Sequence, residues 1–116
     1  MSDTRLYHNP GCSKSRGALE LLRERGVEPK IVAYLDNAPD ADELRALLDL
    51  LALPARALLR SGEDAYAALG LGDPTLDDAA LIAAMAAHPQ LIERPVFVHR
   101  GRAVIGRPPE RVLELL

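Results

Sequence analysis

The spacing of apolar and polar residues predicts a strand, a helix and a second strand at the start of the chain. Residues 5–8 (Arg-Leu-Tyr-His) form the first strand, which an Asn-Pro-Gly turn closes at residues 9–11. From Ser13, apolar residues recur at helical spacing as far as Gly26, a residue type that commonly ends helices. Residues 31–35 then predict a strand that pairs in parallel with the first through a right-handed crossover.

The middle of the chain is predicted to be helical throughout. Asp40 and Glu43 match the spacing of a capping box, which predicts a helix at 40–51. Pro54 begins a short helical piece that runs to residue 60. Two further helices are predicted at about 63–69 and 75–87.

The end of the chain is predicted to form a hairpin and a last helix. Residues 96–98 and 103–105 pair around a tight turn at 99–101, and a terminal helix opens at Pro108, with three apolar residues facing inward: Val112, Leu113 and Leu116. This order is that of a thioredoxin-like α/β fold with a small mixed sheet and an inserted helical subdomain. We expect a single domain at 1–116, with its core at 4–36 and 92–116 and its insert at about 40–88.

Composition excludes several classes of protein. The chain of 116 residues carries a net charge of -3, which argues against a general nucleic-acid binder because such binding uses excess positive charge. It has neither a long apolar run nor a signal-like start, so we expect a cytoplasmic protein that does not bind membranes. One cysteine and three histidines without ligand spacing predict no metal site.

Cys12, the single cysteine, is the candidate nucleophile. It follows a strand and a glycine-containing turn and precedes a helix, where free backbone N–H groups and the helix dipole favour a thiolate. Three nearby side chains, Lys14, Arg16 and His8, add positive potential. A lone cysteine is more often a small buried apolar residue, so its position in the turn carries this interpretation.

The residues after Cys12 separate three cysteine chemistries. A tyrosine-phosphatase-like loop needs an arginine six residues after the cysteine, and Ala18 stands there. A dithiol oxidoreductase needs Cys-x-x-Cys, and Ser15 stands in place of the second cysteine. Any redox turnover must therefore take its second thiol from another molecule.

Residues 7–16 (Tyr-His-Asn-Pro-Gly-Cys-Ser-Lys-Ser-Arg) resemble the active-site loop of the glutaredoxin-dependent arsenate reductase family. The similarity continues in order at 56–60, 88–89, 93–95 and 106–108, and so covers essentially the whole chain. The well-studied resistance enzymes resemble Cys-Gly-Thr-Ser-Arg at the loop, which indicates a sister branch. The resemblance implies roles for seven residues: Cys12 as nucleophile, His8 and Ser15 as aids to its thiolate, Arg60, Arg94 and Arg107 as oxyanion ligands, and Pro95 as a cis-proline beside the site.

The resemblance also implies a reaction and its partners. Cys12 would form a covalent adduct with arsenate or a similar oxyanion, and glutathione would release arsenite and leave a mixed disulfide for glutaredoxin. Glutathione is then a co-substrate, no cofactor is bound, and we expect a monomer.

Two alternatives remain open. The protein would be a monothiol, glutathione-linked thiol-disulfide oxidoreductase if Cys12 did not react with arsenate. A regulator of the Spx type, which binds RNA polymerase on the same fold, is the other alternative. Such regulators typically carry Cys-x-x-Cys, and Ser15 argues against this class.

Overall fold

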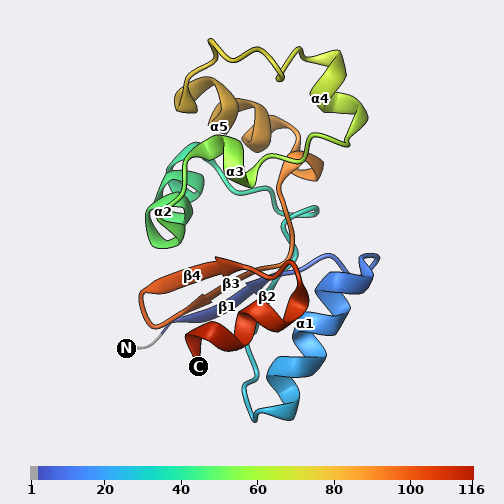
Figure 1. Ribbon diagram of the computed structural model, residues 1–116, viewed down its shortest axis with the longest axis vertical. Helices are drawn as coiled ribbons and strands as arrows, with labels where there is room; N and C mark the ends of the chain where they lie inside the picture. The colour runs from blue at the N-terminus through green and yellow to red at the C-terminus, as the bar shows by residue number, and fades with distance from the viewer. Residues whose placement is uncertain (1–2) are drawn as a thin grey trace. The chain divides into compact units, whose positions relative to one another are not determined.

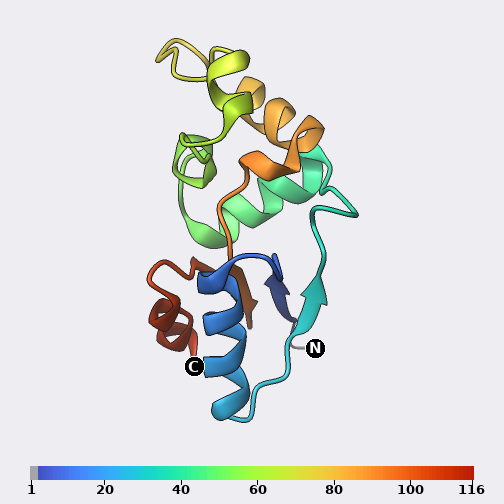
Figure 2. The same cartoon turned by 90° about the vertical axis from the view of Figure 1, so that its right-hand side faces the viewer.

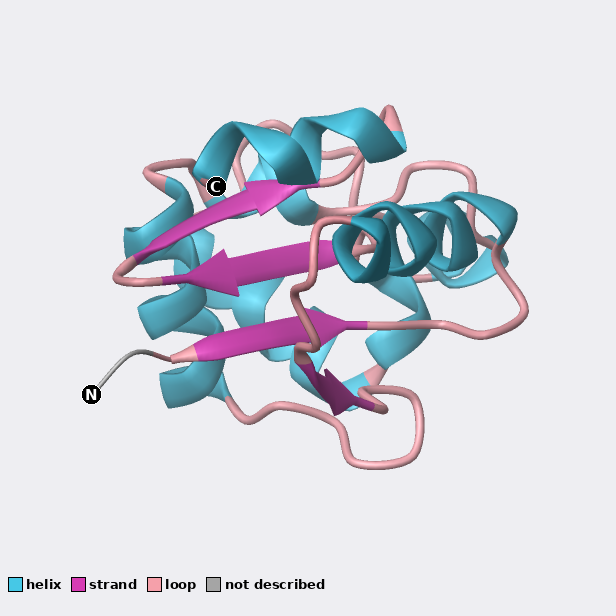
Figure 3. Ribbon diagram, turned by 90° about the horizontal axis from the view of Figure 1, so that it is seen from below, coloured by secondary structure: helices cyan, strands magenta, loops and turns pink. Residues whose placement is uncertain are grey.

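A mixed four-stranded sheet is the centre of one part of the computed structural model, which describes residues 3–116. The strands are β1 (Thr4–Tyr7), β2 (Lys30–Val32), β3 (Val96–His99) and β4 (Arg102–Ile105), in the spatial order β2-β1-β3-β4 (Figure 3). β1 pairs with β2 in parallel and with β3 antiparallel, and β3 pairs with β4 antiparallel. The predicted thioredoxin-like α/β class is confirmed.

The chain divides into two compact units. The first comprises the chain up to Asn37 together with Arg94–Leu116, and it contains the sheet. The second comprises Ala38–Glu93 and is helical. Within residues 3–116, no helix is long and apolar enough to cross a membrane.

One face of the sheet packs against α1 (Ser13–Glu24) and the 3-10 segment η2 (Pro109–Leu115), which lie side by side (Figures 1 and 2). Leu6, Phe97 and Val104 are in register on neighbouring strands and therefore point to the same face. They form a buried core with residues of α1 and η2: Ala18, Leu22 and Val112. α1 begins at Ser13 as predicted, and Gly26 beyond its end has a φ of +76°, which suits glycine.

The second strand is shorter than the predicted 31–35. β2 ends at Val32 because the backbone turns there, with the N–H of Tyr34 donating to the carbonyl of Val32 at 3.0 Å. The amides of Asp36 and Asn37 both donate to the carbonyl of Ala33, which completes the turn. The apolar run therefore continues past the strand into a bend.

At the end of the chain, one of the three residues predicted to face inward is exposed. η2 is a 3-10 helix, in which residues three apart lie on the same face. Leu115 therefore follows Val112 onto the core, where Leu113 also packs, whereas Leu116 lies beyond the end of η2. Leu116, which was predicted to face inward, has an exposed fraction of 47%.

The second unit contains five helical segments: α2 (Ala41–Leu51), α3 (Ala55–Leu58), α4 (Asp64–Ala68), α5 (Asp78–Ala87) and the 3-10 turn η1 (Pro89–Leu91). Asp40 caps α2 by accepting a hydrogen bond from the N–H of Glu43 at 2.8 Å, as the capping pattern predicts. α5 starts later than the predicted residue 75, because Thr75 is held in a turn by Asp73 and because Asp77 caps the helix at Ala80.

We expect Gly106→Ala to destabilise the first unit. A Cβ at position 106 would lie 2.9 Å from Cγ of Pro95 and 3.0 Å from Cγ1 of the buried Val112, and neither neighbour is a flexible chain end. Overpacking of this kind lowers the free energy of unfolding by about 1–3 kcal/mol, which urea denaturation measures.

Gly62→Ala is the matched control, because a Cβ there meets nothing within 4 Å. Its free energy of unfolding should stay within about 0.5 kcal/mol of the parent value. Equal stability of the two variants would contradict the close packing at Gly106.

Candidate functional site

The loop between β1 and α1 holds Cys12 at the start of the helix. The side-chain oxygen of Asn9 accepts a hydrogen bond from the N–H of Gly11 at 2.9 Å. The backbone carbonyl of Asn9 accepts one from the N–H of Cys12 at 3.0 Å. Cys12 is the N-cap residue with an extended backbone, and its carbonyl accepts the N–H of Arg16 at 3.0 Å. The half-buried thiol therefore stands where the first N–H groups of α1 have no helical partner.

These surroundings lower the pKa of Cys12. Burial is the largest single effect and raises the pKa, but the lowering effects together outweigh it, and the backbone N–H groups of Ser15 and Lys14 are the first of these. The positive charge of Arg94 and a hydrogen bond from its side chain lower the pKa further. Lys14 thus acts on the thiolate through its backbone. The net effect favours the reactive thiolate form.

Ser15 and His8 form a buried polar pair beneath this loop. The Ser15 hydroxyl accepts the N–H of Asn9 at 3.0 Å and is hydrogen-bonded to Nδ1 of His8 at 2.6 Å. Burial lowers the pKa of His8, and the nearby charges of Arg23 and Arg16 lower it further, so the ring is neutral near pH 7. His8 is therefore linked to the loop through the Ser15 hydroxyl, whereas the Ser15 backbone N–H lowers the pKa of Cys12.

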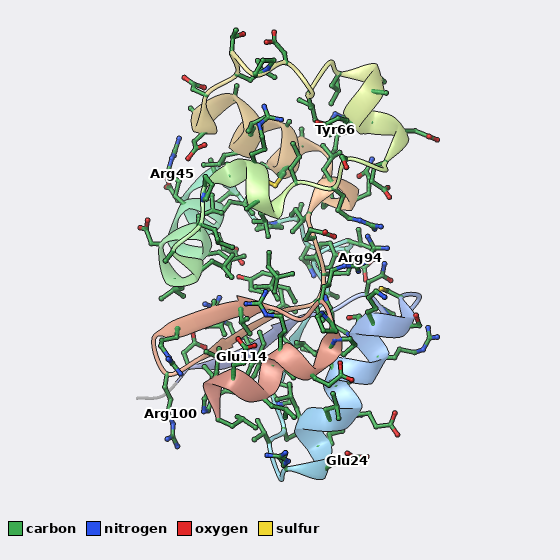
Figure 4. The ribbon with its side chains drawn as sticks, viewed as in Figure 1. Glu24, Arg45, Tyr66, Arg94, Arg100 and Glu114 are labelled. Carbon is green, nitrogen blue, oxygen red and sulfur yellow. The ribbon has the colours of Figure 1, made fainter. Side chains whose placement is uncertain are left out.

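The hairpin brings Arg94, Pro95 and Arg107 together. The peptide bond between Arg94 and Pro95 is cis, and the carbonyl of Pro95 accepts the N–H of Gly106 at 2.8 Å. One guanidinium nitrogen of Arg107 donates to the carbonyl of Arg94 at 3.2 Å. Figure 4 shows Arg94 at the end of the sheet where α1 begins, and the side chain of Arg94 lowers the pKa of Cys12. Two of the three predicted arginines thus meet at the thiol end of this unit.

Arg60, the third predicted arginine, belongs to the second unit. The backbone bridge between Leu59 and Ile92 places it beside Glu93. Its side chain, 21% exposed, lies 3.3 Å from a carboxylate oxygen of Glu93 and 3.5 Å from one of Glu63. These two ion pairs neutralise much of its charge. Its role as an oxyanion ligand stays a prediction.

The site chemistry rests on a thiolate beside guanidinium groups. No group of three or more potential metal ligands (His, Cys, Asp or Glu) occurs within residues 3–116. A thiolate beside backbone N–H groups is a nucleophile. A nearby arginine can balance the negative charge on the molecule that the thiolate attacks. The arrangement therefore suits nucleophilic attack on a negatively charged oxyanion.

Sequence reasoning missed the role of Asn9. The residues Asn-Pro-Gly at 9–11 signal a turn, but the pattern does not show that the Asn9 amide and carbonyl both order the thiol loop. An asparagine at the start of a turn commonly bonds to the backbone two residues on, and that rule could have identified it. The pairing of Arg60 with Glu93, by contrast, depends on a contact between distant segments, whereas Glu63 is only three residues away.

Comparison with known proteins places the chain in a family. It is 53% identical over 113 residues to the uncharacterized protein YfgD of Escherichia coli (strain K12), across 97% of this chain and 95% of that protein. It is 46% identical over 117 aligned positions, the full length of both chains, to a Neisseria meningitidis serogroup B protein named arsenate reductase. A solved structure described as arsenate reductase from Vibrio cholerae matches with a TM-score of 0.95 and 50% identity over 98% of each chain. The model of the ArsC family matches residues 7–115, and the chain therefore belongs to the ArsC family.

Proposed function

We propose that this protein reduces arsenate to arsenite, with Cys12 as nucleophile and glutathione and glutaredoxin as external reductants. The observation that carries the proposal is the Cys12 thiol itself, with a lowered pKa and Arg94 against its sulfur. Relatives that match the whole chain and are named arsenate reductases support the choice of substrate.

In the first step, the Cys12 thiolate attacks the arsenic of arsenate. A sulfur–arsenic bond forms, one arsenic–oxygen bond breaks, and the oxygen leaves as water after it is protonated. The lowered pKa of Cys12 raises the fraction of the thiol that is ionised at a given pH, and the thiolate is the nucleophile. Arsenic remains in the +5 state in this adduct.

The guanidinium groups of Arg94 and Arg107 balance the charge of the arsenate oxygens. Arginine offers a planar set of donors that matches a tetrahedral oxyanion, and it stays charged at any working pH. The bond from Arg107 to the carbonyl of Arg94 couples the positions of these two residues. Arg60 is the third proposed ligand, and binding would then compete with its ion pairs to Glu63 and Glu93.

In the second step, a glutathione thiolate attacks the sulfur of Cys12. A sulfur–sulfur bond forms, the sulfur–arsenic bond breaks, and its electron pair stays on arsenic, which leaves as arsenite in the +3 state. The two sulfur atoms supply the two electrons and become a mixed disulfide. The chain cannot supply this second thiol because Cys12 is its single cysteine.

Glutaredoxin completes the cycle in this proposal. Its thiolate attacks the glutathione sulfur of the mixed disulfide, and the Cys12 thiolate leaves. Attack at the glutathione sulfur returns the enzyme to its starting state, since the leaving group is the thiol with the lowered pKa.

Arsenate-dependent oxidation of NADPH, coupled through glutathione reductase, glutathione and glutaredoxin, tests the proposal. We expect steady turnover by the parent protein and background rates for Cys12→Ser, because serine is not ionised near neutral pH and cannot act as a thiolate. Circular dichroism and thermal unfolding check that the variant keeps its fold.

Two results would contradict this proposal. Retained turnover in Cys12→Ser would exclude Cys12 as the nucleophile. Reduction of a glutathionylated peptide without any arsenate-dependent turnover would favour the monothiol oxidoreductase instead.

Arg107→Ala should weaken arsenate binding more than Arg100→Ala. Arg107 contacts the Arg94 segment, whereas Arg100 lies in the turn at the other end of β3 (Figure 4). We expect the arsenate KM to rise about tenfold for Arg107→Ala, as for the loss of one charge-assisted hydrogen bond of about 1.5 kcal/mol. Steady-state kinetics measure both variants, and equal KM values would exclude Arg107 as a ligand.

Arg94→Ala should raise the pKa of Cys12. The charge and hydrogen bond of Arg94 lower this pKa in the parent, so their removal shifts thiolate formation to higher pH. The rate of alkylation by iodoacetamide, followed against pH, should show a higher midpoint in the variant. Arg102→Ala, an exposed residue of β4, serves as the control and should keep the parent midpoint. A midpoint unchanged by Arg94→Ala would contradict the contact with the sulfur.

A further inference from the structure

Asn9 lies at the centre of the hydrogen bonds that order the thiol loop. Its side-chain oxygen accepts the N–H of Gly11 at 2.9 Å, its backbone carbonyl accepts the N–H of Cys12 at 3.0 Å, and its own N–H donates to the Ser15 hydroxyl at 3.0 Å. Residue 10 is a proline and has no N–H. Both N–H groups between Asn9 and the start of α1 are therefore bonded to Asn9 itself.

The side chain of Asn9 packs against the backbone of this turn. A Cβ at position 11 would lie 3.3 Å from its Oδ1, which is closer than most Cβ contacts. A side-chain oxygen in this position takes the part of a backbone acceptor and fixes the chain two residues on, as in an Asx turn. Gly11, the residue that is fixed, directly precedes Cys12, so the turn decides where Cys12 enters the helix.

Other turns and helix starts of this chain use a carboxylate for the same task. Asp40, Asp73 and Asp77 each accept a backbone N–H two or three residues on, at 2.8, 2.9 and 2.9 Å. The backbone N–H of Thr75 is the largest cause of a lowered pKa at Asp73, so a carboxylate in such a turn is ionised near neutral pH. The turn beside the thiol has an amide instead, which accepts the same bond without a negative charge.

The absence of a charge at position 9 matters because the sulfur reacts as an anion. A nearby negative charge disfavours a thiolate and raises its pKa, against the effects of Arg94 and of the N–H groups at the start of α1. The oxygen of Asn9 bonds to the residue next to Cys12. An aspartate at position 9 would therefore keep the turn but oppose the thiolate.

We propose that Asn9 is a positioning residue for Cys12 and that its amide has two tasks. The amide oxygen holds the turn that places Cys12 at the start of α1, and the neutral amide leaves the charge of the thiolate unopposed. The inference rests on the proposed function only in that Cys12 is the nucleophile. It adds a residue to the thiol site and a reason why this residue is asparagine and not aspartate.

Alkylation of Cys12 by iodoacetamide, an uncharged reagent, tests both tasks without any arsenate. The rate constant followed against pH reports the ionisation of the thiol, and urea denaturation reports the stability of the fold. Asn9→Ala removes the acceptor and adds no charge, whereas Asn9→Asp keeps the acceptor and adds a negative charge. Asn37→Ala is the matched control, because Asn37 is an exposed asparagine of the same unit.

For Asn9→Ala, the rate constant at a pH below the midpoint should fall about fivefold, as for the loss of one hydrogen bond of about 1 kcal/mol. For Asn9→Asp, the midpoint should also move to higher pH, although the turn and the stability are kept. Because about 1 M salt shortens the Debye length to about 3 Å, it should restore part of the rate lost in Asn9→Asp but none of that lost in Asn9→Ala. Asn37→Ala should keep the parent pH profile.

A parent-like pH profile in Asn9→Ala would overturn the inference, whatever its stability, since the side chain would then serve the fold alone. A parent-like profile in Asn9→Asp would overturn it as well, because a charge at position 9 would then not act on the thiolate. These outcomes are separate from the arsenate assay. Shifted profiles without arsenate turnover would keep the role of Asn9 and reject the arsenate proposal, whereas turnover with unshifted profiles would do the reverse.

Discussion

The position of Cys12 at the start of α1, where the backbone N–H groups of Lys14 and Ser15 lower the pKa of its thiol, is the constraint on which the site depends. A helix start leaves several N–H groups without partners, and a thiolate satisfies them while their partial charge stabilises it. The Asn9 turn places the sulfur at that point, and the buried pair of Ser15 and His8 holds the turn from below. The nucleophile is thus produced mainly by backbone groups.

Close packing of the hairpin fixes the position of the arginines at the end of the sheet where Cys12 lies. Gly106 leaves no room for a side chain between Pro95 and Val112, so the segment that carries Arg94 lies tightly against the strand that leads to Arg107. The amide of Gly106 and the guanidinium of Arg107 both bond to this segment. A core of six buried residues therefore fixes where the cationic groups lie relative to the thiol.

A single cysteine separates the nucleophile from the reductant. With no resolving thiol in the chain, the proposed reduction must take its second sulfur from another molecule.

The sequence by itself determined the elements around Cys12 and their class. The Asn-Pro-Gly turn, the start of α1 and the hairpin depend on neighbouring residues, and local rules predict them. The same rules failed where other contacts decide: β2 stops at Val32, and η2 turns Leu115 inward in place of Leu116. Only the tertiary structure decided that Arg94 reaches the sulfur of Cys12, because strand pairing, and not local preference, joins residues so far apart in the chain.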